Sequence, residues 1–177
     1  FELMPRPAGY RFHTEGRVEG GRLVVSSAEV APEDSPVLDL EFDLDPAATE
    51  VTARLAFRRN PHALASDRAA PLVLDGEQQS DVRVEVDGVP VPAERLRFGA
   101  GSLTMLEPPS SGVLTVRSRN DAARNASLEG LYVSSGVFCT QCEPEGFRRI
   151  TFFPDRPDVL ARSTVTLRAD RTAFPVL

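Results

Sequence analysis

The most regular feature of the chain is an alternation of apolar and acidic residues over positions 37–45. Leucine or phenylalanine occupies every second position there, with aspartate or glutamate between. A period of two predicts a β-strand with one face in a core and the other in water. Residues 46–49 supply turn chemistry, and the alternation resumes over 51–57 with Arg54 on the polar side. The two segments therefore predict a hairpin whose polar face sets carboxylates against arginine.

Turn residues bound several further short strands. These are predicted at residues 71–74, 82–86, 95–98, 102–106, 113–117 and 164–169. Weak helical patterns occur at 62–68 and after Pro157, and residues 1–36 predict one hairpin followed by a linker. Turns recurring about every eight to fifteen residues are typical of sandwiches. The predicted fold is all-β, an antiparallel β-sandwich or saddle with very little helix, in a single domain over residues 1–177.

Composition and charge narrow the function classes. No apolar stretch approaches the roughly 20 residues that span a bilayer. The net charge is −6 and all 20 basic residues are arginine, which argues against a binder of nucleic-acid phosphates. The two cysteines are too few for a secreted disulfide scaffold, and no leader precedes Phe1. These features predict a cytoplasmic protein that binds neither membranes nor nucleic acid.

Few residues have the spacing of a self-contained catalytic site. The two histidines, His13 and His62, stand far apart, and the sequence contains neither a metallopeptidase H-E-x-x-H motif nor a nucleophile elbow. We therefore predict no catalytic residue and no metal ligand within this segment. Cys139 and Cys142 form a C-x-x-C pair without a second pair, which leaves ordinary thiols, a disulfide, or a metal site completed in an oligomer.

The stretch from Ser127 to Arg162 differs from the rest of the chain because its middle lacks clean alternation. Long irregular segments in a strand-rich domain are more often functional loops than connectors. Its polar residues beside phenylalanines are Glu129, Gln141, Glu143 and Glu145. They predict sheltered carboxylates at which a cation can dock. The alternative is that Glu145 and Arg148 are solvated and that 155–158 form a salt-bridged turn.

Three motifs in this region carry a family resemblance. They are NASLEGLY at 125–132, GVFCTQCEPEGFR at 136–148 and DRPDVLAR at 155–162. Together they resemble the N-terminal domain of bacterial aminopeptidase N, a family of zinc-dependent exopeptidases of the gluzincin type. Residues 38–60 and 70–77 are also similar to that family. The resemblance implies that region 125–162 is the functional loop of the domain.

The resemblance implies specific roles. In the family, this β-rich domain caps a catalytic domain, and a Thr-Gln-Cys-Glu loop reaches the active site. By that correspondence Glu143 binds the α-ammonium of a peptide substrate, and Gln141 lines the pocket for the first residue. The Zn²⁺ ligands, the general base and a second glutamate from a G-x-M-E-N motif belong to a catalytic domain expected after residue 177. The segment alone is then inert, and its partners are peptides with a free N-terminus and its own downstream domain.

Some positions depart from the family pattern. Arg149 stands where many members have histidine, and Pro144 stands where alanine is common. Proline at 144 favours an extended backbone at Glu143. One alternative function is a non-catalytic β-sandwich that binds or scaffolds a partner, and another is a redox or zinc protein built on Cys139 and Cys142.

Overall fold

The computed structural model describes residues 12–20, 22–29, 37–59, 69–143, 145–156, 159 and 161–175, with backbone only for 12–19 and 22–29. Within these residues the chain is all-β with two short 3₁₀ turns, η2 (Ala93–Arg95) and η3 (Phe147–Arg149). The strands are β1 (Phe12–Glu19), β2 (Arg22–Glu29), β3 (Val37–Leu44), β4 (Thr49–Arg58), β5 (Leu72–Asp75), β6 (Ser80–Val86), β7 (Val89–Pro90), β8 (Leu96–Gly99), β9 (Ser102–Met105), β10 (Ser111–Asn120), β11 (Gly130–Ser134), β12 (Val137–Gln141) and β13 (Arg162–Asp170). The predicted fold class is confirmed.

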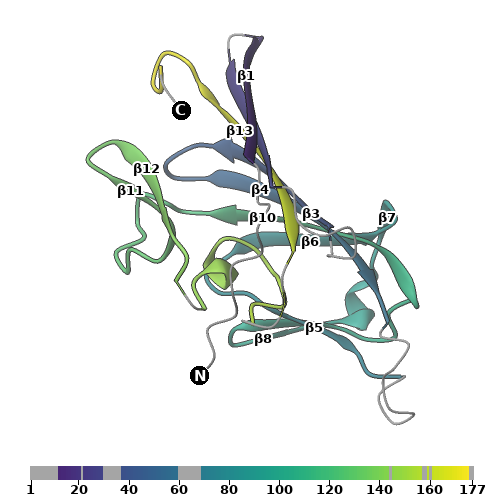
Figure 1. Cartoon of the computed structure of the whole chain (residues 1–177). Coiled ribbons are helices and arrows are strands. Elements are labelled where there is room, and N and C mark those ends of the chain that lie inside the picture. The colour runs from purple at the N-terminus through teal and green to yellow at the C-terminus, as the bar shows by residue number, and fades with distance from the viewer. Residues whose placement is uncertain are drawn as a thin grey trace, which may run out of the picture.

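The largest element is an eight-stranded sheet with the order β1-β2-β13-β3-β4-β10-β6-β7 (Figure 1). Its neighbours pair antiparallel except β13 and β3, which run parallel. β13 lies between β2 and β3, so a late strand joins the first hairpin to the rest of the sheet. The predicted hairpin near the start of the chain is confirmed as β1–β2.

The β3–β4 hairpin has the predicted alternation. Leu38, Leu40, Phe42 and Leu44 on β3 are buried, and the residues between them are half-exposed. The Asp45 carboxylate accepts hydrogen bonds from the amides of residues 47 and 48, which fixes the connecting turn. On the polar face Glu41 pairs with Arg54 of β4 and with Arg168 of β13. The predicted pairing of carboxylates with arginine is therefore confirmed, with a third strand included.

The core lies between the large sheet and a second sheet of three strands, ordered β5-β9-β8 (Figure 1). Leu74 of β5 and Leu103 and Met105 of β9 are almost wholly buried, and they belong to one apolar cluster with the inward side chains of β3, β4 and β10. Burial of apolar area on this scale is the main contribution to stability.

The stretch predicted to be irregular contains a hairpin. β11 and β12 pair antiparallel from Gly130 opposite Gln141 to Ser134 opposite Val137, and the hairpin projects at one side of the molecule (Figure 1). The segment after it is fixed to the body by the Asn120 side chain, which donates 2.8 Å to the Ile150 carbonyl. A bridge between Asp75 and Phe153 adds two backbone hydrogen bonds. The base of the hairpin therefore rests on a well-anchored segment.

The weak helical pattern at 62–68 lies on residues outside the described ranges, and so do residues 157, 158 and 160 of the pattern after Pro157. Across the described residues, no helix has both the length and the apolar character that crossing a membrane requires.

Candidate functional site

Gln141 and Glu143 lie where the β11–β12 hairpin rejoins the body. Gln141 is the last residue of β12, and Glu143 follows two residues later; both are exposed. The Gly146 amide donates 2.7 Å to the Glu143 carbonyl, and Glu145 has a φ of 74°. A hydrogen bond from the fourth residue to the first and a positive φ at the third are features of a type II turn. The turn fixes the backbone that carries Glu143.

The same two side chains line one hollow of about 360 Å³. Its walls come from the loop after β5, the segment before β11, the end of β12 and the segment around η3. The lining residues are Glu77, Glu129, Gln141, Glu143, Glu145, Gly146, Arg148 and Arg149. Six of the eight carry a charge, so the hollow is an electrostatic rather than an apolar site.

Arg148 is held from several sides on one wall of this hollow. Its backbone amide and its Nε donate 3.0 and 3.1 Å to one carboxylate oxygen of Asp155. A second ion pair joins it to Glu145 at 3.6 Å. Burial opposes the charged form, but the hydrogen bond that Arg148 donates to Asp155 and the charges of nearby carboxylates outweigh it and raise the pKa of Arg148. The alternative that Glu145 and Arg148 are solvated holds for Glu145, whose side chain is 65% exposed, but not for Arg148, whose side chain is 16% exposed and pairs with Asp155.

Arg149 pairs with two carboxylates. Its Nε lies 3.1 Å from Glu129 and a terminal nitrogen lies 3.3 Å from Glu77. Its other terminal nitrogen donates 3.0 Å to the Ser127 hydroxyl. Gly130 makes this approach possible, because a Cβ at that position would lie 2.6 Å from the Arg149 Cβ. Glycine at 130 therefore lets the base of the hairpin contact η3.

The ion pairs leave one carboxylate of the hollow unused. Glu77, Glu129 and Glu145 each pair with one of the two arginines. Among the residues that the structure describes, the Glu143 carboxylate has neither an ion-pair nor a hydrogen-bond partner. An exposed, unpaired carboxylate in an otherwise paired site is suited to bind a cation brought from outside. Chemically, the arrangement can hold a charged amine.

The residues present do not fit a metal ion. In the described part of the chain, no group of three or more histidine, cysteine, aspartate or glutamate residues has a metal-binding arrangement. Cys139 and Cys142 are free thiols. Burial, followed by the charge of Asp155, raises the pKa of Cys142, which disfavours the thiolate that a metal or a redox reaction needs.

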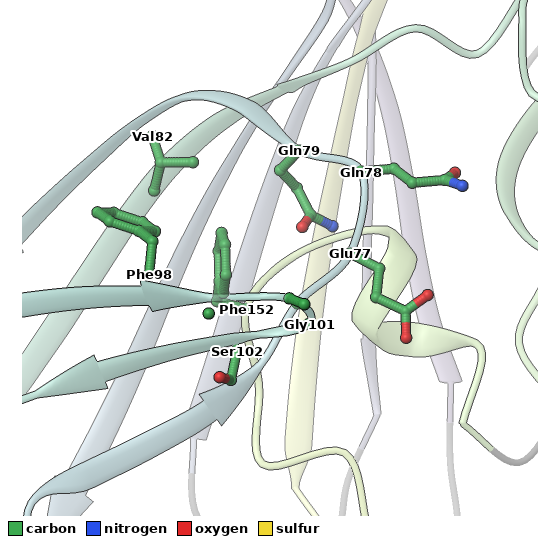
Figure 2. Close-up of a pocket in the computed structure, with 11 residues that line it drawn as sticks. Glu77, Gln78, Gln79, Val82, Phe98, Gly101, Ser102 and Phe152 are labelled. Carbon is green, nitrogen blue, oxygen red and sulfur yellow. The ribbon is translucent and has the colours of Figure 1, made fainter.

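A second hollow of about 450 Å³ is also lined by the loop after β5 (Figure 2). Val82, Phe98 and Phe152 form its apolar part, and the rings of Phe98 and Phe152 meet edge to face with centroids 6.4 Å apart. Gly76 leaves room for Phe152, because a Cβ there would lie 2.1 Å from that ring. Glu77 lines both hollows.

The structure brings together the site residues that the sequence predicted. Glu129, Gln141, Glu143 and Glu145 were predicted as a sheltered group. All four line the first hollow, but all four are exposed, so the predicted shelter is wrong for these residues. The contribution of Glu77 was not predicted, because it lies 72 residues from Arg149 and no local pattern links the two. The paired state of Arg149 was also not predicted. Pro144 lies outside the described residues, so its predicted effect on Glu143 stays a prediction.

The chain is similar to three bacterial enzymes named aminopeptidase N. It is 47% identical over 131 residues to that of Caulobacter vibrioides, 44% over 140 residues to that of Escherichia coli, and 38% over 140 residues to that of Haemophilus influenzae. These matches cover 74%, 79% and 78% of the chain, respectively. The chain spans about 15% of the length of each of these relatives.

Comparison of structures also finds an aminopeptidase. The fold matches part of Legionella pneumophila aminopeptidase A, solved in complex with aspartic acid, with a TM-score of 0.66 and 29% identity. The match covers 80% of this chain and 16% of that one. A scan against protein-family models gives no match. The predicted resemblance is nevertheless confirmed by sequence and by structure, and the chain is a relative of a segment of the bacterial aminopeptidase N family.

Proposed function

We propose that this chain is the N-terminal, substrate-capping domain of a longer zinc aminopeptidase, and that Glu143 binds the α-ammonium group of the peptide. Gln141, which lines the same hollow, forms part of the pocket for the first residue. The observation that carries the proposal is the Glu143 carboxylate, which has no partner among the described residues and lies in a hollow whose other glutamates pair with arginines. The relatives named aminopeptidase support it.

A fixed carboxylate suits this reaction for a physical reason. An exopeptidase must distinguish the charged amine at a chain end from internal peptide bonds, which carry no charge. A charge-assisted hydrogen bond to the ammonium group makes that distinction and fixes the distance to the scissile carbonyl. Glu143 is exposed in this chain, and the proposed catalytic domain would cover it and exclude water. In a site desolvated in this way, loss of such a partner costs about 2–5 kcal/mol.

The test is Glu143→Gln in the full-length polypeptide, assayed with an aminoacyl substrate. The substitution keeps size and removes charge, and kcat/KM should fall at least about 30-fold, which corresponds to about 2 kcal/mol. Glu94→Gln is the matched control, because Glu94 is exposed in η2 and does not line the hollow. A kcat/KM within about threefold of wild type would contradict the proposal.

Zinc would supply the hydrolytic chemistry of such an enzyme by activating water. The described residues contain no arrangement that fits it, so the proposal assigns the metal to the catalytic domain. The 177-residue chain alone should release no amino acid from a peptide with a free N-terminus. If the full-length polypeptide is also inactive, the alternative of a non-catalytic binding module is favoured.

We also propose a reducing, cytoplasmic location. Cys139 and Cys142 are free, as expected of thiols in that compartment. Mass spectrometry of protein taken directly from cells should find both unmodified, and a disulfide between them would contradict this location.

A further inference from the structure

Arg149 connects three separate segments around the hollow. It lies in η3, and its guanidinium bonds Glu77 after β5 at 3.3 Å, Glu129 before β11 at 3.1 Å, and the Ser127 hydroxyl at 3.0 Å. The Glu77 side chain points away from the rings of Phe98 and Phe152 (Figure 2). The Arg149 side chain is 19% exposed, so its charge is partly shielded from water and its ion pairs are less screened than surface pairs.

The charges of the hollow depend strongly on this one residue. Arg148 is engaged by Asp155 and Glu145, which leaves Arg149 as the partner of Glu77 and Glu129. Removal of the Arg149 charge would leave both carboxylates without their arginine, in the hollow that also holds Glu143. The hollow would then attract a second cation as well as the first.

We propose that Arg149 is a specificity-determining positioning residue. It occupies Glu77 and Glu129, so that Glu143 remains the single carboxylate available to an ammonium group. The enzyme is thereby kept from favouring peptides whose first side chain carries a second positive charge. This inference rests on the proposed function, because it assumes that the substrate amine enters this hollow.

Arg149 also positions part of the hollow through its contact with Gly130. Gly130 pairs with Gln141 across the hairpin, and the Arg149 Cβ lies against the position where a Gly130 side chain would be. Arg149 therefore supports the strand end that presents Gln141. A purely mechanical support would affect all substrates equally, whereas charge neutralisation distinguishes cationic from neutral side chains.

The experiment compares lysyl and norleucyl p-nitroanilides in the full-length enzyme. Both side chains have the same unbranched four-carbon chain, and only the lysyl one ends in an ammonium group. In Arg149→Met, the ratio of kcat/KM for the lysyl over the norleucyl substrate should rise about tenfold. In the triple variant Arg149→Met, Glu77→Gln, Glu129→Gln the ratio should return to within about threefold of wild type. Arg124→Met is the control, because Arg124 is 89% exposed and does not line the hollow.

Two results would overturn the inference. One is an unchanged ratio in Arg149→Met, and the other is a raised ratio that persists in the triple variant. If Arg149→Met does not fold, the double variant Glu77→Gln, Glu129→Gln tests the inference instead. With Arg149 present and both carboxylates removed, the ratio of kcat/KM for the lysyl over the norleucyl substrate should fall about tenfold. Glu143→Gln separates this inference from the proposed function: it should lower kcat/KM for both substrates whatever the outcome at Arg149.

Discussion

Gly130 gives the sharpest stability prediction, because two separate costs can be measured there. Its φ is 71°, in the left-handed region that a Cβ disfavours. A Cβ would also lie 2.6 Å from the Arg149 Cβ and 3.2 Å from the Arg149 carbonyl carbon. These atoms belong to the backbone or are bonded to it, so rotation of a side chain cannot relieve the overlap.

Gly136 isolates the first cost. It has a φ of 80° at the tip of the same hairpin, and a Cβ there would meet no atom within 4 Å. Gly136→Ala should therefore cost about 1–2 kcal/mol from backbone conformation, partly offset by the lower entropy of the unfolded chain. Gly130→Ala carries the same cost plus about 1–3 kcal/mol for overpacking against Arg149. The total for Gly130→Ala is about 2–5 kcal/mol.

The assay is urea denaturation of the wild-type chain and of each alanine variant, with the free energy of unfolding extrapolated to water. The two variants should differ by at least about 1 kcal/mol, with Gly130→Ala the less stable. Equal losses, within about 0.5 kcal/mol, would refute the reasoning, because they would mean that η3 does not press on the base of the hairpin.

Two further predictions concern the two sheets that enclose the core. Leu103→Ala in the central strand β9, where Leu103 is 1% exposed, should lower the free energy of unfolding by about 2–5 kcal/mol in the same urea assay, and a loss under about 1 kcal/mol would contradict its place in the core. Burial raises the pKa of Glu41, but the hydrogen bonds and charges of Arg54 and Arg168 outweigh it and leave the pKa below its ordinary value. The stabilisation from Glu41 should therefore be complete above about pH 5 and lost as the pH falls through the lower, folded-state pKa. The difference in Tm between the wild-type chain and Glu41→Gln should shrink between pH 7 and pH 3. A Tm difference that stays constant over this range would contradict the prediction.

Local patterns predicted the strands well because they depend on near neighbours. The β3–β4 hairpin follows from alternation and from the turn at Asp45, both within about twenty residues. The parallel pairing of β13 with β3 was not predicted, because the residues of 162–170 indicate a strand but do not indicate which strands lie beside it. Hairpin β11–β12 was missed for another reason: its positive φ at Gly136 marks a tight turn, but apolar residues lie on both its faces and obscure the alternation.

The site was predictable only in part. Gln141 and Glu143 were found through a family motif, since an exposed glutamate has no sequence pattern of its own. The ion pairs that leave Glu143 unoccupied depend on Glu77 and Arg149, which the fold brings together from distant segments. Long-range charge pairing of this kind is a property of the folded chain, and no local window of sequence contains it.

The position of β13 has a consequence for synthesis on the ribosome. The first hairpin, residues 12–29, is made early, but its neighbour in the sheet is made about 130 residues later. Until β13 emerges, the edges of β2 and β3 both lack their partner and are open to pairing with other nascent chains. Closure of the sheet is therefore a late event, and a chaperone that shields strand edges should act mainly before residue 170 leaves the exit tunnel.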